Sequence, residues 1–153
     1  MDTTENFLKQ IVDFMPERKS LKYKSIEHFV LENGKAYGEP ISFPPGIKRG
    51  VAKECFKNAF DLFSLHHKEE WKYVEGYAFS IAIPMLHAWV VNSEGQVIDP
   101  TWRDGKDYYG VEFPYQYLVR TMMRTKYYGV LDAWKIGFPL LTGEDPYPIP
   151  ERS

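Results

Sequence analysis

The stretch of sequence that decides the fold is residues 86–102, which read LHAWVVNSEGQVIDPTW. Its first part, Leu86–Asn92, is rich in β-branched and aromatic residues and predicts a strand, and Gln96–Ile98 predicts a second, shorter one. The residues between them, 93–95, are Ser, Glu and Gly and favour a tight turn. The two strands are therefore expected to form an antiparallel hairpin, preceded by another strand-like run at Trp71–Ser80.

Upstream of these strands, Val51–His66 is the clearest predicted helix. Its apolar residues gather on one face, its polar residues lie on the other, and no proline interrupts it. It follows a loop, Glu39–Gly50, that contains too many proline and glycine residues for the interior of a regular element. The sequence thus predicts a loop that leads directly into a long amphipathic helix.

Further helices are predicted on both sides of this region. One lies near the N-terminus, where Thr3 or Thr4 can cap an apolar stripe formed by Phe7, Ile11, Val12 and Met15. Another spans Tyr115–Lys126. The segment Tyr23–Tyr37 leaves two alternatives open, a short helix capped by Gly34 or one arm of a hairpin that turns there.

The order of elements, helices first, then antiparallel strands and then more helix, indicates an α+β fold rather than alternating βαβ units. Residues 1–153 are expected to form a single domain, because the length supports one core and leaves little for a second. Arg103–Asp107 reads as a polar turn after the hairpin. The Pro-rich tail, residues 139–153, is predicted to be extended or loosely packed.

Composition excludes several classes of protein. The formal net charge of −2 argues against a dedicated nucleic-acid binder, which normally has a basic excess. The single cysteine rules out an intramolecular disulfide and a zinc site built on several thiolates. The apolar runs are far shorter than the ~20 residues of a membrane span, and the acidic N-terminus does not resemble a signal peptide. We therefore expect a cytoplasmic protein without a membrane or nucleic-acid partner.

Three residues with catalytic chemistry fall on the predicted elements. Cys55 lies in the first turns of the long helix, where the positive end of the helix dipole can stabilise a thiolate. His87 begins the first strand of the hairpin and Asp99 ends the second, so their side chains can meet across the strand pair. Taken singly, each has a structural explanation, as a buried helix residue, a core or surface histidine and a turn residue. Together they suit a nucleophile, a base and a group that orients the base.

The order of these residues resembles a known family. A helix-borne Cys55, a strand that starts with His87-Ala88-Trp89 and a strand that ends in Asp99-Pro100-Thr101 resemble the core of the transglutaminase-like cysteine enzymes, of the transglutaminase-like and papain-like superfamily. Tyr73–Tyr77 is similar to the strand that precedes the histidine strand in that family. The resemblance covers about residues 50–103, roughly a third of the chain.

The resemblance implies a fold in which the helix that carries Cys55 packs against a small antiparallel β-sheet. It also implies a hydrolase or acyltransferase that attacks amide, isopeptide or thioester bonds, with Cys55 as nucleophile, His87 as base and Asp99 as orienting residue. No cofactor or metal is implied, and the expected partner is a peptide, amide or thioester substrate. The residues expected to bind this substrate are Tyr77, Trp89 and Trp102. Core packing is the alternative for the two tryptophans.

The same residues allow other interpretations. Cys55, His87 and Asp99 would also suit a mononuclear zinc ion, because zinc accepts sulfur, nitrogen and oxygen ligands. The chain can instead be a non-enzymatic binding or inhibitor protein that keeps the fold and uses its aromatic surface and Pro-rich tail for a partner. Glu75, beside Gly76 on the strand before His87, is expected to face solvent.

Overall fold

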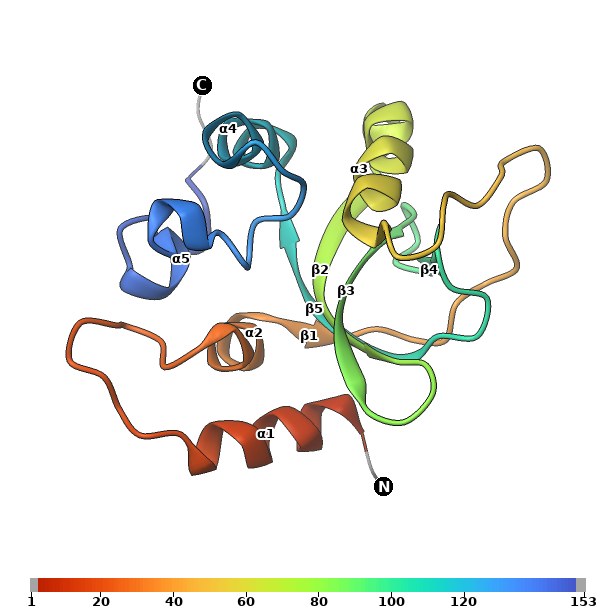
Figure 1. The fold of residues 1–153 in the computed structure, drawn as a ribbon. Coiled ribbons are helices and arrows are strands. Elements are labelled where there is room, and N and C mark those ends of the chain that lie inside the picture. The colour runs from red at the N-terminus through yellow and green to blue at the C-terminus, as the bar shows by residue number, and fades with distance from the viewer. Residues whose placement is uncertain (1–2, 151–153) are drawn as a thin grey trace.

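The computed structural model describes residues 3–150 and has a mixed α+β fold, in which helices surround one curled antiparallel sheet (Figure 1). The helices are α1 (Thr4–Phe14), α2 (Ile26–Asn33), α3 (Cys55–His66), α4 (Tyr115–Thr125) and α5 (Pro139–Thr142), with short 3-10 turns at η1 (His67–Glu69) and η2 (Trp134–Ile136). The strands are β1 (Lys35–Ala36), β2 (Lys72–Phe79), β3 (Pro84–Val91), β4 (Val97–Ile98) and β5 (Lys106–Phe113).

The sheet has the strand order β1-β5-β2-β3-β4, and every neighbouring pair is antiparallel. β2 lies in the middle and pairs with β3 along the whole length of both strands. The hairpin expected from residues 86–102 is the β3–β4 pair, with Val90 opposite Ile98 and Val91 opposite Val97. The predicted α+β class and the predicted hairpin are both confirmed.

Strand β5 is an element that the sequence does not predict, since Arg103–Asp107 reads as a polar turn. In the structure, residues 106–113 pair with both β2 and β1. Gly110 of β5 lies opposite Gly76 of β2, and a Cβ atom on Gly76 would come within 2.2 Å of the carbonyl oxygen of Tyr109. The missing side chain permits this close approach of two backbones, but glycine weakens the local strand signal.

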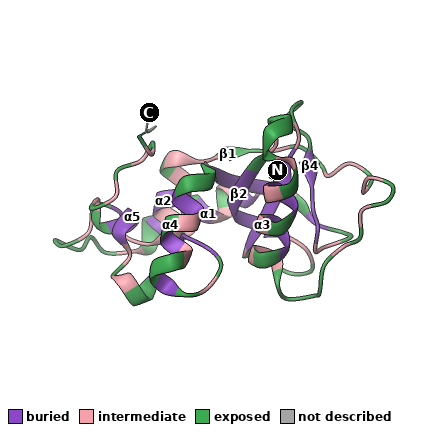
Figure 2. Cartoon of the chain, turned by 90° about the horizontal axis from the view of Figure 1, so that it is seen from above, coloured by how far each residue is buried: buried purple, intermediate pink, exposed green. Residues whose placement is uncertain are grey.

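The two faces of the sheet carry different clusters, because successive side chains of a strand point to opposite sides. One face lies under the helices and forms the main core, which includes Tyr73, Ala88 and Val111. The other face holds a smaller cluster around Trp89 and Tyr108. Figure 2 shows that α3 and α4 both carry buried and exposed residues, as amphipathic helices should, and of the two it is α3 that packs on strands β2 and β3.

Helix α3 begins at Cys55, later than predicted, and this start defines the site described below. Lys53 has a φ of 70°, in the left-handed region that a right-handed helix excludes. The side chain of Asn58 donates a hydrogen bond of 2.9 Å to the carbonyl oxygen of Val51, which lies outside the helix and is exposed. Cys55 therefore occupies the first helical position, where backbone N–H groups lack partners within the helix.

The other predicted helices are present. The N–H of Asn6 donates to the side chain of Thr3, which caps α1. The ambiguous segment resolves as a helix, because α2 ends at Asn33 and the N–H of Gly34 donates to the carbonyl oxygen of Val30. Helix α4 agrees with its prediction to within one residue at its C-terminal end.

Residues 139–150 of the C-terminal tail pack against the body of the protein, whereas the sequence suggests an extended or loosely packed segment; residues 151–153 of that prediction lie outside the described part of the chain. The ring of Tyr147 meets those of Phe29 and Phe113 edge to face, and its hydroxyl donates to the carbonyl oxygen of Glu112 at 2.8 Å. Leu141 accepts two backbone hydrogen bonds from the segment before α2. The contacts of Tyr147 thus hold this segment against the core although most of it has no regular secondary structure. Across residues 3–150, no helix combines the length and the apolar character needed to cross a membrane.

Candidate active site

The hairpin brings His87 and Asp99 into direct contact. Nε2 of His87 and Oδ2 of Asp99 are 2.8 Å apart, and both residues are buried, with relative exposures of 0% and 2%. His87 lies on β3 and Asp99 follows β4, so the antiparallel pairing of these strands places the side chains next to each other. The juxtaposition expected from the sequence is present.

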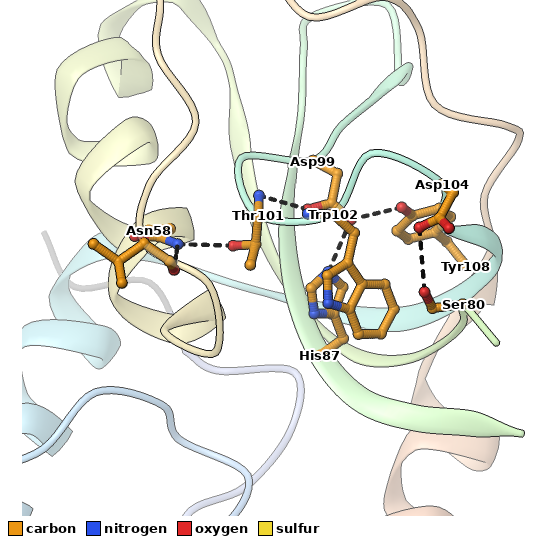
Figure 3. Close-up of polar contacts among 9 residues, drawn as sticks. Asn58, Ser80, His87, Asp99, Thr101, Trp102, Asp104 and Tyr108 are labelled. Carbon is orange, nitrogen blue, oxygen red and sulfur yellow. Dashed lines mark hydrogen bonds and ion pairs between the residues drawn. The ribbon is translucent and has the colours of Figure 1, made fainter. Parts of the chain in front are cut away.

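Asp99 is held by donors on both carboxylate oxygens. Oδ2 accepts the hydroxyl of Tyr108 at 2.6 Å as well as His87, and Oδ1 accepts the backbone N–H groups of Thr101 and Trp102 at 2.9 Å each (Figure 3). Burial alone would raise the pKa of Asp99, but the hydrogen bonds from His87, Tyr108 and Trp102 lower it below its usual value. Asp99 is therefore a fixed negative charge at neutral pH.

His87 is held in one orientation by an aromatic lid. The ring of Trp102 stacks on the imidazole with centroids 3.6 Å apart and an angle of 9° between the planes (Figure 3). Because Asp99 can only accept, Nε2 of His87 carries the hydrogen and Nδ1 keeps a free lone pair. Nδ1 is buried and has no hydrogen-bond partner among the described residues. The imidazole thus presents one unpaired nitrogen that can accept a proton.

Cys55 lies beside this pair. Backbone hydrogen bonds from Ala88 and Phe56 reach its sulfur, and Ala88 directly follows His87 on β3. The pKa of the Cys55 thiol is nevertheless raised to about 11, because burial first and then the negative charges of Glu75 and Asp99 outweigh those two hydrogen bonds. Burial and two carboxylates therefore oppose the thiolate that the sequence predicts at the start of this helix.

A polar brace joins the helix of Cys55 to the turn of Asp99. Nδ2 of Asn58 on α3 donates to Oγ1 of Thr101 at 2.9 Å (Figure 3), and the N–H of Gly50 donates to the carbonyl oxygen of Pro100 at 2.8 Å. A Cβ atom on Gly50 would lie 2.0 Å from Oδ1 of Asn58, so no side chain fits there. In the sequence, the only hint of this brace is the polar residue Asn58 among the apolar residues on the buried side of α3.

Glu75 is fully buried, which contradicts the expectation that it faces solvent. Strand alternation places it on the helix-covered face of β2, where its carboxylate accepts the hydroxyl of Tyr73 at 2.5 Å and the N–H groups of Val130 and Leu131 at 2.8 and 3.0 Å. Burial raises the pKa of Glu75 to about 7, although these three donors lower it. The site therefore contains a second carboxylate, close enough to Cys55 to affect its ionisation.

The three residues proposed to bind substrate have different positions. Tyr77 belongs to the main core and Trp89 is completely enclosed in the smaller cluster, so neither presents a free surface to a ligand. Trp102 is partly exposed and covers His87. Of the three, only Trp102 borders the site.

The structure also contains a cavity away from Cys55, His87 and Asp99. It has a volume of about 620 Å³ between β5, α4 and the tail, with Phe113, Tyr117 and Tyr147 in its wall, and no member of the Cys55–His87–Asp99 group lines it. The zinc alternative finds no cluster to support it, since residues 3–150 contain no group of three or more His, Cys, Asp or Glu side chains arranged to hold a metal ion.

Comparison of the chain with protein-family models, curated proteins and solved structures finds no match. The resemblance to the transglutaminase-like enzymes therefore rests on the residues of this chain alone, and its functional meaning is a proposal.

Proposed function

We propose that this protein is a cysteine hydrolase or acyltransferase with a transglutaminase-like core, in which Cys55 attacks an amide, isopeptide or thioester carbonyl. One observation carries the proposal. His87 is fixed by Asp99 through Nε2, its Nδ1 is unpaired, and the sulfur of Cys55 accepts the N–H of the very next residue of the strand. These residues suit the roles of nucleophile, base and orienting carboxylate, with the base and the carboxylate in direct contact and the cysteine beside the next residue of the base's strand.

The chemistry balances over two steps. In the first, Nδ1 of His87 takes the thiol proton, the sulfur of Cys55 bonds to the carbonyl carbon, and the leaving amine or thiol departs with the proton from His87. In the second, water or an amine loses its proton to His87 and attacks the thioester, and the C–S bond breaks to regenerate Cys55. The first backbone N–H groups of α3 have no partner within the helix, and we assign to them the stabilisation of the intermediate oxyanion.

The raised pKa of Cys55 constrains this mechanism. A thiol that titrates near 11 instead of 9.0 has about 100-fold less thiolate at neutral pH. A preformed thiolate is thus not the resting state, and proton transfer to His87 must accompany the attack on the substrate. Cys55 is only partly buried, so a bound substrate would remove further water from its thiol.

The alternative is a binding protein that keeps the fold without catalysis. Two features favour it, the raised pKa of the Cys55 thiol and the complete burial of His87 beneath Trp102. A substrate must reach Cys55 from a side that leaves this lid in place, or Trp102 must move.

The proposal is tested by alkylation and acylation of Cys55. The chain has one cysteine, so the mass gain after iodoacetamide reports this residue alone. We expect wild type at pH 7 to react at least 10-fold faster than His87→Ala, whose rate should fall about 100-fold below that of free cysteine because no base compensates for the raised thiol pKa. A small thioester or p-nitrophenyl ester should leave an acyl group on Cys55 of wild type only.

The matched control is His66→Ala, a change at the opposite end of the same helix, where His66 stacks on Trp71. It should react like wild type in both assays. If wild type and His87→Ala are alkylated at equal rates, and neither forms an acyl adduct, the catalytic proposal is wrong and the binding protein becomes the better interpretation.

A further inference from the structure

A small cavity lies near Cys55 on the helix-covered side of the sheet, and although Cys55 itself does not line it, its neighbour Phe56 and the carboxylate of Glu75 do. Its volume is about 190 Å³, and its wall includes Phe56 and Leu86, the chain neighbours of Cys55 and His87, together with Glu75. The rest of the wall comes from the segment Tyr127–Trp134, which connects α4 to α5 (Figure 1). We call this space the Cys55 cavity. A group bound there would lie next to the proposed nucleophile, on the opposite face of the sheet from the lid Trp102.

Aromatic rings make up much of the wall. Phe56, Tyr127, Tyr128 and Trp134 all line the Cys55 cavity, and Trp134 and Tyr128 remain exposed, with relative exposures of 59% and 40%. Tyr127 and Trp134 stack on each other with centroids 6.4 Å apart. Exposed rings gathered at a cavity are available to a ligand, and their faces attract cations through the ring quadrupole.

The charged residues of the wall are all acidic. Glu75 and Asp132 line the Cys55 cavity, and no lysine, arginine or histidine does. Burial is the main reason that the pKa of Glu75 is raised, and the negative charge of Asp132 adds to it, so the two carboxylates are close enough to repel each other. A cation placed between these carboxylates would relieve that repulsion, whereas an anion would increase it.

The rings already attract ammonium groups of the chain itself. Nζ of Lys135 lies 5.6 Å from the ring centre of Tyr127 and 5.8 Å from that of Trp134, and Nζ of Lys57 lies 6.0 Å from that of Tyr128. Neither lysine lines the Cys55 cavity. The rings thus carry cations outside the cavity, while the cavity itself combines the same rings with two carboxylates.

We propose that the Cys55 cavity binds an alkylammonium or guanidinium group on the molecule that acylates Cys55, so that the protein selects cationic acyl donors. A peptide or amide with a lysine-like or arginine-like side chain close to the reactive carbonyl has this chemistry. The inference rests on the proposed function, since it assigns the substrate class of the same site. Aromatic faces bind the flat or methylene-rich part of the group, and Asp132 and Glu75 neutralise its charge.

Charged thiol reagents test the inference without a substrate. Three methanethiosulfonates that carry a trimethylammonioethyl, a methyl or a sulfonatoethyl group differ mainly in charge, and each modifies a cysteine by the same reaction. The thiolate attacks the sulfenyl sulfur, a disulfide forms, and methanesulfinate leaves. Second-order rates at Cys55, divided by the rates of the same reagents with free cysteine, isolate the contribution of the protein. We expect wild type to favour the cationic over the anionic reagent by at least 10-fold.

Two variants should remove this preference. Asp132→Asn and Trp134→Ala should each lower the ratio of cationic to anionic rates at least 3-fold. The control Glu94→Gln removes one negative charge from the β3–β4 turn, away from the Cys55 cavity, and should leave the ratio within 1.5-fold of wild type. The inference would be overturned if the normalised rates of wild type with the cationic and anionic reagents were about equal. It would also be overturned if both cavity variants kept the wild-type preference.

The failure of the inference can be told apart from failure of the proposed function. Loss of His87 as a base lowers the rates of all three reagents together, so His87→Ala should keep the wild-type ratio. A preserved ratio with no His87 effect would leave a cation-binding cavity beside an inactive cysteine. A strong His87 effect with no charge preference would leave an active cysteine without the cationic specificity.

Discussion

Replacing Glu75 by Gln should remove a penalty of about 3 kcal/mol that the ionised carboxylate imposes on the folded state at neutral pH. Burial raises the pKa of Glu75 from 4.5 to about 7, and the side chain is fully enclosed. Each unit of pKa is worth about 1.4 kcal/mol, which gives this order of magnitude. Glutamine is neutral throughout, and its Oε1 can accept the N–H groups of Val130 and Leu131 at 3.1 and 3.0 Å. Its amide nitrogen replaces the oxygen that accepts Tyr73 and the Val130 N–H, which adds a cost that does not depend on pH.

The direction in which pH changes the unfolding free energy follows from proton binding by Glu75. The folded protein holds the Glu75 proton more tightly than the unfolded chain, so the contribution of this residue to stability is complete below pH 4.5. It decreases as the pH rises from 4.5 to about 7 and is constant above that. The stability of Glu75→Gln relative to wild type should therefore increase over this window and then stop changing.

Urea unfolding at pH 4, 5.5 and 7.5 measures this directly. Any constant cost of the altered hydrogen bonds shifts the difference in unfolding free energy equally at each pH, so only its pH dependence is diagnostic. About 3 kcal/mol corresponds to roughly 6–12 °C in melting temperature for a chain of this size. Glu94→Gln, an exposed change in the β3–β4 turn, should show a flat difference. A flat difference for Glu75→Gln as well would refute the argument from burial.

Two further changes probe the fold and the site. Gly76→Ala should destabilise the protein by at least about 3 kcal/mol, because its Cβ would meet the backbone of Tyr109, whereas Gly38→Ala, with open space around it, should be neutral or slightly stabilising in the same unfolding assay. Asn58→Ala should cost about 1–3 kcal/mol and also reduce the His87-dependent part of Cys55 alkylation, since it breaks the brace. Asn33→Ala loses only a local hydrogen bond at the end of α2, so equal alkylation losses in the two variants would exclude a role for the brace.

Local patterns were sufficient for part of this protein. Residues 86–102 predict the hairpin because β-branched residues, a Ser-Glu-Gly turn and short-range pairing act within one stretch of chain. The amphipathic periodicity of residues 51–66 predicts α3 for the same reason. The contact between His87 and Asp99 then follows from antiparallel geometry alone. The positions of His87 and Asp99 in the sequence were enough to predict that their side chains meet.

Long-range contacts decided the rest. β5 becomes a strand because Gly110 can lie against Gly76, and Glu75 is buried because β2 is central and its odd-numbered face is covered by helices. The start of α3 at Cys55 depends on Asn58 reaching back to Val51. The ionisation of Cys55 depends on burial and on two carboxylates distant in sequence. The sequence by itself determined which groups are available for chemistry and which local elements carry them. Tertiary structure alone decided their solvent exposure and their charge, because desolvation depends on every element that packs around a residue.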